Sequence, residues 1–296
     1  MTTRDITFSP DGKEAYFRVA LEGFLHSAIV GVRRTASGWT EPEVPDFAAD
    51  PRWKTLEPHI SPDGRGFYFV SNRPEDPKDQ APAPMGIWVM DRGPAGWGAP
   101  RRLGSGINGP DGSFFPSVTR DGTLYFCRDG ADGRGSVWRA RRRGGGFEAA
   151  ERLPDRVQVG RARYNPFIAQ DESFMVLAAM GLKDSVGGLD YYVLFRNAED
   201  QWSQPLNLGS MINHAGNGEE SASLSPDGTY LFFASARGGK ESFARGGKLT
   251  LRRLQDLDRR PGENGRMAIY WVEASFLDEL KKAAVFPIGK EEGQQQ

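Results

Sequence analysis

The sequence contains few of the residues on which metal centres and disulfide frameworks depend. Its 296 residues include one cysteine, Cys127, and three histidines, His26, His59 and His214. A single cysteine cannot form an internal disulfide, so cysteine content does not reveal the redox compartment. Because Cys127 lies in an apolar run, we expect a small buried side chain rather than a nucleophile. The histidines fall in separate parts of the chain, and we predict neither a metal site nor a cofactor.

A dominant charge and a long apolar run are also missing. The chain has 38 Lys and Arg against 39 Asp and Glu, a formal net charge of -1. No overall field therefore attracts nucleic acid or an acidic membrane, and no apolar run approaches the length of a membrane helix. Gly-x-Ser-x-Gly, a Walker loop and His-Glu-x-x-His are absent, which excludes the hydrolases, nucleotide enzymes and zinc proteases that carry them.

What the sequence does contain is a short phrase that recurs five times. Its clearest copy is LSPDGTYLFF at residues 224–233, and its aspartates stand at 11, 63, 121, 171 and 227. Proline, aspartate and glycine in this order favour a tight turn, and apolar residues on both sides make it the turn of a hairpin. A period of about 50 residues with strand-like contents predicts a repeat array.

The turn motif has a structural role in this interpretation, and we expect its aspartates to shape the turns rather than to bind a ligand. Two copies depart from the pattern. Asp171 is followed by Glu172 instead of glycine, and Arg120 replaces the proline before Asp121. These two turns are the least well specified.

Each repeat continues with a third strand and a short fourth segment that opens with an aromatic residue. The third strands are expected at residues 28–32, 87–90, 137–140, 191–195 and 269–272, and the aromatic segments at 38–42, 96–100, 146–147 and 201–205. Four short strands in each unit predict an all-β, five-bladed β-propeller with a short C-terminal helix, with a six-bladed ring as the alternative. We expect one domain over residues 1–290, with blades at about 5–47, 57–104, 114–154, 164–209 and 220–282, and a disordered tail at 291–296.

The Ser-Pro-Asp-Gly turn followed by Tyr-Phe resembles the WD40-like (PD40) repeats of the TolB-type β-propeller superfamily. The ending IYWVEASF at residues 269–276 resembles the end of single-domain bacterial members, and the likeness extends over about residues 5–282. It implies a scaffold that serves in binding, in translocation or beside an enzyme. It transfers no catalytic residue, because the shared motif is structural. It also implies a periplasmic or extracellular location, although no charged and apolar leader precedes the first repeat.

Blade five departs from the other repeats. Residues 237–267 form an insertion with nine Lys or Arg and four acids, and its leucines predict a short helix. It is either a docking arm for an anionic partner or a tolerated loop. A helix with Ser275 as its N-cap follows. Residues 285–288 are a candidate closing strand, because only four residues precede Asp5; otherwise the last blade has three strands.

An arginine-rich stretch at residues 139–146 has two interpretations. It is either a solvated strand edge that charge protects from aggregation, or a nucleic-acid patch, which the lack of interleaved aromatics disfavours.

The candidate site is the mouth of the central channel. Residues at the start of the inner strands are unusually polar, and the candidates are Arg4, Asp5, Glu57, His59, Arg163, Asn165, Glu219 and Glu220. Carboxylates near one axis can bind a cation or act as acid and base on a sugar, and an arginine can hold a carboxylate ligand. Mutual salt bridges would instead leave a solvated rim.

The leading hypothesis is a non-catalytic binding scaffold whose channel mouth takes a small ligand, a glycan or a protein partner. The alternative is a carbohydrate-active hydrolase or lyase that uses Asp5, Glu57, Glu219 or Glu220. Carboxyl groups about 5 to 9 Å apart in an open pocket favour the second hypothesis, and acids paired with Arg4 and Arg163 favour a rim. We expect a monomer.

Overall fold

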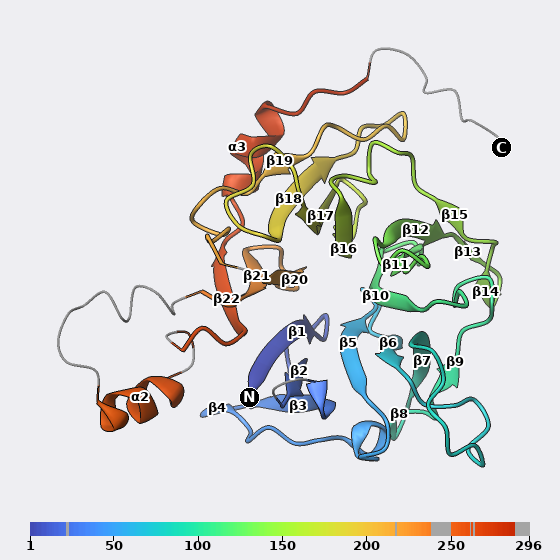
Figure 1. Cartoon of the computed structure of the whole chain (residues 1–296). Helices are drawn as coiled ribbons and strands as arrows, with labels where there is room; N and C mark the ends of the chain where they lie inside the picture. Colours follow the sequence, from blue (N-terminus) through green and yellow to red (C-terminus); the bar gives the residue numbers. More distant parts are fainter. Residues whose placement is uncertain (22–23, 217, 238–249, 261, 263, 288–296) are drawn as a thin grey trace.

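Five blades surround one axis in the computed structural model (Figure 1), which describes residues 1–21, 24–216, 218–237, 250–260, 262 and 264–287. The predicted five-bladed β-propeller is therefore confirmed, and the six-bladed alternative is wrong. None of the described helices is long and apolar enough to span a membrane.

The strands follow each blade from the axis outward. Blade one has β1 (Thr2–Phe8), β2 (Glu14–Ala20), β3 (Ser27–Thr35) and β4 (Gly38–Trp39), and the short helix η2 (Asp46–Ala48) follows. Blade two has β5 (Thr55–Ile60), β6 (Gly66–Ser71), β7 (Gly86–Gly93), β8 (Gly96–Trp97) and β9 (Arg101–Arg102). Blade three has β10 (Ser113–Val118), β11 (Leu124–Arg128), β12 (Ser136–Ala140), β13 (Arg142–Arg143), β14 (Gly146–Phe147) and β15 (Glu151–Arg152).

Blade four has β16 (Ala162–Ile168), β17 (Phe174–Met180), β18 (Asp190–Phe195) and β19 (Leu206–Asn207). Blade five has β20 (Glu219–Leu224), β21 (Tyr230–Ser235) and β22 (Ala268–Glu273), with α2 (Leu251–Asp258) before β22 and α3 (Phe276–Lys282) after it. Both helices were predicted, although Ser275 makes no side-chain capping bond to α3.

The fourth strands lie slightly later in the chain than predicted. In blade two the aromatic segment β8 pairs only with the end of β7, and in blade three β14 pairs with β13. The strands that pair with the middle of the third strands β7 and β12 are β9 and β15, which follow these hairpins. The aromatic therefore marks the turn before the fourth strand.

The aspartates of the repeat shape the turns, as predicted. Asp63 accepts bonds from the Ser61 hydroxyl at 2.6 Å and from the Arg65 amide at 3.0 Å, and Asp11, Asp121 and Asp227 make equivalent bonds. Asp171 accepts both the amide and the hydroxyl of Ser173, because Ala169 has no hydroxyl. The two donors to Asp63 lower its pKa despite its partial burial.

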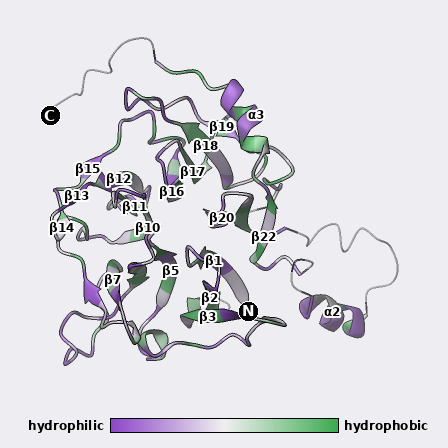
Figure 2. Ribbon diagram, turned by 180° about the vertical axis from the view of Figure 1, so that it is seen from behind, coloured by the Kyte–Doolittle hydropathy of each residue, from purple (hydrophilic) through white to green (hydrophobic). Residues whose placement is uncertain are grey.

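Hydrophobic side chains fill the spaces between blades. One cluster joins blades four and five and includes Tyr191, Phe195 and Phe233. Figure 2 shows hydrophobic residues along strands such as β18, whereas α2 is mainly hydrophilic. Cys127 is buried as expected, and burial raises the pKa of its thiol to about 12.

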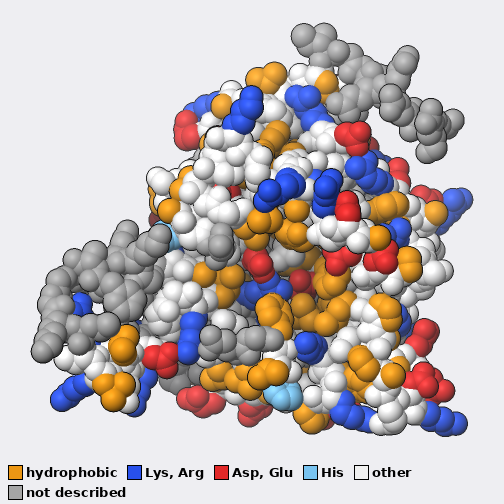
Figure 3. All heavy atoms as spheres, in the orientation of Figure 1, with side chains coloured by type: hydrophobic (Ala, Val, Ile, Leu, Met, Phe, Trp, Pro, Cys, Tyr) orange, Lys and Arg blue, Asp and Glu red, His pale blue; other side chains and the backbone are white. Residues whose placement is uncertain are grey.

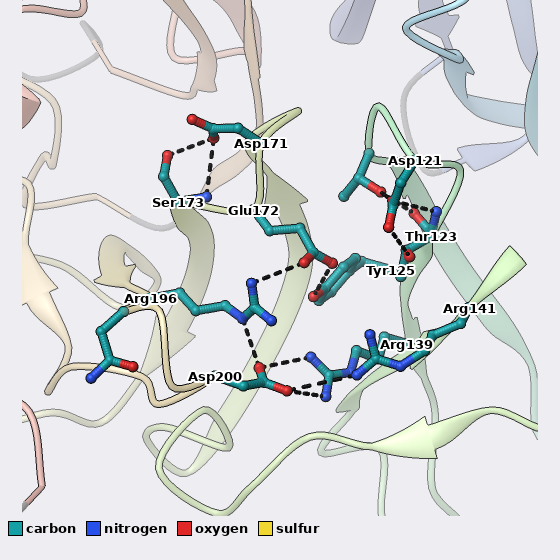
Figure 4. Close-up of polar contacts among 12 residues, drawn as sticks. Asp121, Thr123, Tyr125, Arg139, Arg141, Asp171, Glu172, Ser173, Arg196 and Asp200 are labelled. Carbon is teal, nitrogen blue, oxygen red and sulfur yellow. Dashed lines mark hydrogen bonds and ion pairs between the residues drawn. The ribbon is translucent and has the colours of Figure 1, made fainter.

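A polar network joins blades three and four and explains the turn that lacks glycine (Figure 4). Glu172 has φ +60° without the freedom of glycine, and its amide still closes the turn onto Ala169 O at 2.9 Å. Its carboxylate accepts from the Tyr125 hydroxyl at 2.8 Å and pairs with Arg196 at 2.9 Å. These contacts offset the backbone strain.

The same network determines the role of the first arginine of the 139–146 stretch. Arg139 is 7% exposed, forms a two-pronged contact with Asp200 at 2.9 and 2.6 Å, and contacts Glu151 at 2.6 Å. It is therefore neither a solvated edge residue nor part of a nucleic-acid patch. Two-pronged arginine–carboxylate contacts of this kind are the strong ones.

The ring closes where β1 of blade one contacts all three strands of blade five and the residue next to β22. Thr3 N donates to Met267 O at 3.0 Å, the Ser221 hydroxyl donates to Asp5 Oδ1, and the rings of Phe8 and Phe232 lie 5.0 Å apart. The proposed closing segment at 285–288 lies elsewhere as far as it is described. Val285 exchanges bonds with Gln204 of blade four, and residue 288 and the tail lie outside the described residues.

Ser221→Ala tests this closure. The hydroxyl is buried, donates to Asp5 and accepts from Asn165 Nδ2 at 3.1 Å, so its loss leaves a buried carboxylate oxygen without a donor. We expect the free energy of unfolding to fall by about 1–3 kcal/mol. Denaturant titration measures this, with the exposed Ser210→Ala as a control of nearly unchanged stability. Equal stability of the two variants would contradict the closure.

Candidate functional site

Every inner strand carries a β-bulge at the same level of the axis. One residue in each adopts a positive φ: Asp5 at 61°, Glu57 at 54°, Phe115 at 50°, Asn165 at 53° and Ser221 at 67°. The register of the inner strand shifts at each of these positions. A left-handed residue re-aims its neighbours, so the bulges turn side chains of all five blades toward the channel mouth.

Arg4 lies at the centre of the charges at this mouth. Its guanidinium pairs with Glu220, approaches Glu57 Oε1 to 3.5 Å and approaches Asp5 Oδ2 to 3.2 Å. The last contact is an ion pair only, because Nε is not aligned for a hydrogen bond. Figure 3 shows basic and acidic side chains meeting at the hollowed centre of this face, with hydrophobic side chains around them.

The two buried carboxylates at this level have protein contacts on every oxygen. Asp5 Oδ1 accepts from Ser221, and Oδ2 accepts from the Glu57 amide at 3.3 Å. Glu57 Oε2 accepts from the Phe115 amide at 2.7 Å, and Oε1 from Arg4. The two residues are 4% and 3% exposed, whereas the side chain of Glu220 is 28% exposed. Glu220 is therefore the accessible acid of this group.

A cavity of about 200 Å³ opens above these residues. It is lined by Arg4, Phe24, Glu57, Phe114, Cys127, Asp129, Tyr164, Asn165 and Glu220. The lining combines charged groups and an amide with aromatic rings. Such a combination suits a small polar ligand with an apolar face.

Burial perturbs the charged groups below the cavity. It raises the pKa of Glu57 to about 7, with a further contribution from Asp5 and an opposing one from Arg4. Arg18, paired with Arg4 across the two strands, has its pKa lowered to about 10 by burial and then by Arg4. Its Nε donates to Ser27 at 2.8 Å. A second buried cation thus lies near Asp5 and Glu57.

Four candidate residues do not line this cavity: the buried Asp5, described above, and His59, Arg163 and Glu219. His59 accepts from the Val118 amide at 2.9 Å and lines a separate cavity, and burial lowers its pKa to about 4. Arg163 donates to the carbonyl oxygens of Val159, Gly135 and Gly160 at 3.0, 2.9 and 2.8 Å, so it braces a loop. Glu219 neighbours Glu220 on β20 but points the other way, because strand side chains alternate, and accepts from Ser235 at 3.0 Å.

Several lining residues had no distinct signal in the sequence. Phe24 and Tyr164 were ordinary aromatics, and Asp129 follows β11 without a motif. Burial raises the pKa of Asp129, helped by Asp111. Arg18 could have been found from the hairpin, since it stands opposite Arg4 in the register.

Within the described part of the chain, no three His, Cys, Asp or Glu side chains are grouped to hold a metal.

Comparison with known proteins shows the fold. No protein-family model and no curated protein matches the sequence. Among solved structures, TolB from Acinetobacter baumannii matches with a TM-score of 0.52 and 18% identity, over 80% of this chain and 49% of TolB. The chain has a TolB-like β-propeller fold and spans about half the length of that protein.

Two glycoside hydrolases share the fold at a similar level. The exo-β-1,3-galactanase 1,3Gal43A from Clostridium thermocellum matches with a TM-score of 0.52 and 13% identity, over 92% of this chain and 59% of the enzyme. An α-L-arabinofuranosidase from Lactobacillus brevis matches with 0.50 and 11%, over 91% and 90%. At such identities the likeness shows architecture alone.

Glu219 provides a test of the electrostatics. Burial raises its pKa to about 7, above the ordinary value of 4.5, so the folded state binds more protons than the unfolded state between these values. The contribution of this group to stability is therefore lost as the pH rises through that window. Glu219→Gln removes the titration. We expect its melting temperature, relative to wild type, to increase from about pH 4.5 to about pH 7.5.

Thermal melts of both proteins across this pH range measure the difference. Glu57 and the histidines are common to both proteins, so their titrations cancel in the comparison. Parallel melting curves at all pH values would show that Glu219 is not perturbed.

Proposed function

We propose that the channel mouth binds a small polar ligand, a sugar unit of a glycan, without transforming it. The observation that carries the proposal is the cavity of about 200 Å³ over a fixed set of charges. Glu220 and Asn165 supply acceptor and donor groups, while Phe114 and Tyr164 supply flat apolar faces. Sugar rings present hydroxyls around their edge and C–H groups on their faces, which match such a wall.

The fixed charges favour binding over catalysis. A glycosidase needs two carboxyl groups facing the bond that breaks, one of them free to give a proton. Asp5 and Glu57 are buried, and their oxygens are engaged by Ser221, by backbone amides and by Arg4. They hold the bulges and Arg4 in place, which prepares the site for a ligand without reorganisation.

One observation favours a second candidate function, carbohydrate hydrolysis or lyase chemistry. Asp129 lines the same cavity as Glu220, and burial raises its pKa, as a general acid requires. Asp129 and Glu220 lie on different blades, so two accessible carboxyls border one space. This alternative uses Glu220 from the original candidates together with Asp129.

Binding is tested by calorimetric titration with a panel of neutral and acidic mono- and disaccharides. We expect saturable binding of one class, weakened about tenfold by Glu220→Gln or Tyr164→Ala, as for loss of one well-made contact. Glu148→Gln, an exposed acid that pairs with Arg143 on blade three, is the matched control and should bind as wild type does. Equal binding by all four proteins, or none by wild type, would refute the site.

Catalysis is tested on the same sugars as chromogenic aryl glycosides and as oligosaccharides. The binding proposal predicts no release of aryl alcohol and no shortening of the oligosaccharides. Turnover that is lost in Asp129→Asn and retained in Glu148→Gln would establish the second function instead. Bound sugar recovered unchanged after long incubation would support the first.

A further inference from the structure

Blade five has three strands in the described part of the chain, and its outer strand β22 has one edge that no described strand covers. In an antiparallel pair, the backbone groups of successive residues point alternately to the two neighbours. Ala274 N donates to Thr229 O at 2.8 Å, toward the axis. Ile269, Trp271 and Glu273 therefore direct their amides and carbonyls outward.

The other four blades show what occupies this position. In blade four, Leu208 N donates to Tyr191 O at 3.1 Å, and Ser203 N donates to Phe195 O at 2.8 Å. The remaining Tyr191 amide donates to the side chain of Asn213 at 2.7 Å.

Blade two repeats this arrangement with different residues. Leu103 N donates to Ile87 O at 3.0 Å, and the Ile87 amide donates to Asn108 Oδ1 at 2.7 Å. In blade three, Leu153 N donates to Val137 O, and the Val137 amide donates to Gln158 Oε1, both at 2.9 Å. In blade one, Glu43 exchanges bonds with Gly31.

The residues of β22 can be matched one by one with those of the third strands in the other blades. Thr3 N donates to Met267 O at 3.0 Å, as Ser113 N donates to Met85 O at 3.2 Å beside blade two. Ile269 thus corresponds to Ile87. No described residue bonds the outward amides and carbonyls of β22, and Trp271 is 63% exposed on this strand.

The covering segments of blades two, three and four share a phrase. A buried leucine is followed four residues later by a buried Ile or Val and five residues later by an amide side chain. The three copies are Leu103-Ile107-Asn108, Leu153-Val157-Gln158 and Leu208-Ile212-Asn213. The leucine packs between blades and the amide bonds the first outward amide of the third strand. The 296 residues contain no further copy of this spacing.

We propose that β22 binds an extended segment of a partner protein, which pairs with it as the fourth strand of blade five. Strand addition of this kind is an established mode of peptide recognition, in which main-chain bonds give affinity and side-chain pockets give specificity. The partner segment carries a leucine and, five residues on, an Asn or Gln. The helix α2, which projects on the outer side of β22 (Figures 1 and 2), has four arginines and two aspartates within residues 250–260. The excess positive charge of α2 favours acidic residues next to the partner segment.

The probe is a fluorescein-labelled peptide of residues 204–214, QPLNLGSMINH, which covers blade four in this chain. Fluorescence anisotropy during titration with the whole chain should show saturable binding. Replacing both Leu208 and Asn213 by alanine in the peptide should weaken binding about tenfold, or ~1.4 kcal/mol. A version with two glutamates added at one end should bind more tightly at low salt than at high salt.

Ile269→Pro in the protein removes the outward amide that the asparagine would bond, and proline is tolerated where an edge strand directs its N–H away from the sheet. We expect about tenfold weaker binding. Ile269→Ala, which loses a similar side chain but keeps the amide, is the matched control and should bind nearly as wild type. Circular dichroism of both variants verifies folding, and the peptide variants test the proposal independently if proline unfolds the chain.

Two results would overturn the proposal. The first is an absence of binding, or binding that the alanine peptide reproduces. The second is self-association of the wild type in light scattering that Ile269→Pro abolishes, since the edge would then pair with a second copy of the chain.

Discussion

The structure depends on a backbone constraint that is repeated five times: one left-handed residue in each inner strand. Two of the five positions, Asp5 and Asn165, are held by residues that accept this conformation more readily than most, and none is held by glycine. The strain at each is of the order of 1 kcal/mol and persists only where the surroundings enforce it. Here the enforcement comes from the side chains of the same residues, since Asp5, Glu57 and Asn165 bond directly to the neighbouring inner strands.

The charges at the mouth follow from that arrangement. Two carboxylates that brace the bulges are buried, and burial of charge requires a partner. Arg4 supplies it for both and for Glu220, which places a cation at the axis with the acids around it. Asp5 and Glu57 therefore have a structural role in this cluster, and Glu220 is the acid that remains accessible to a ligand. This explains why a rim of salt bridges and a ligand site, which the sequence presents as alternatives, occur together.

Much of the fold could be predicted because its signal is local and repeated. The turn phrase specifies a hairpin, and the spacing of its five aspartates specifies the number of blades. The candidate site could be predicted less completely. The structure brings Arg4, Asp5, Glu57, Asn165 and Glu220 together, whereas alternation on β20 directs Glu219 to Ser235, and Arg163 bonds the loop before β16. The bulges were not predictable, because Asp, Glu, Phe, Asn and Ser share no pattern and their conformation is enforced by other blades.

Ring closure and the open edge of blade five are separate matters in this propeller. Many closed rings depend on a terminal strand that completes the last blade, so an uncovered third strand would weaken the circle. Here blades one and five meet at Asp5 with Ser221 of β20 and at Phe8 with Phe232 of β21, and Thr3 bonds Met267 directly before β22. β22 stands farther out, and in blade two the equivalent bond from Ser113 to Met85 coexists with a paired fourth strand. The edge can therefore accept and release a strand while the channel mouth keeps its geometry, since the two sites are built on different strands of blade five.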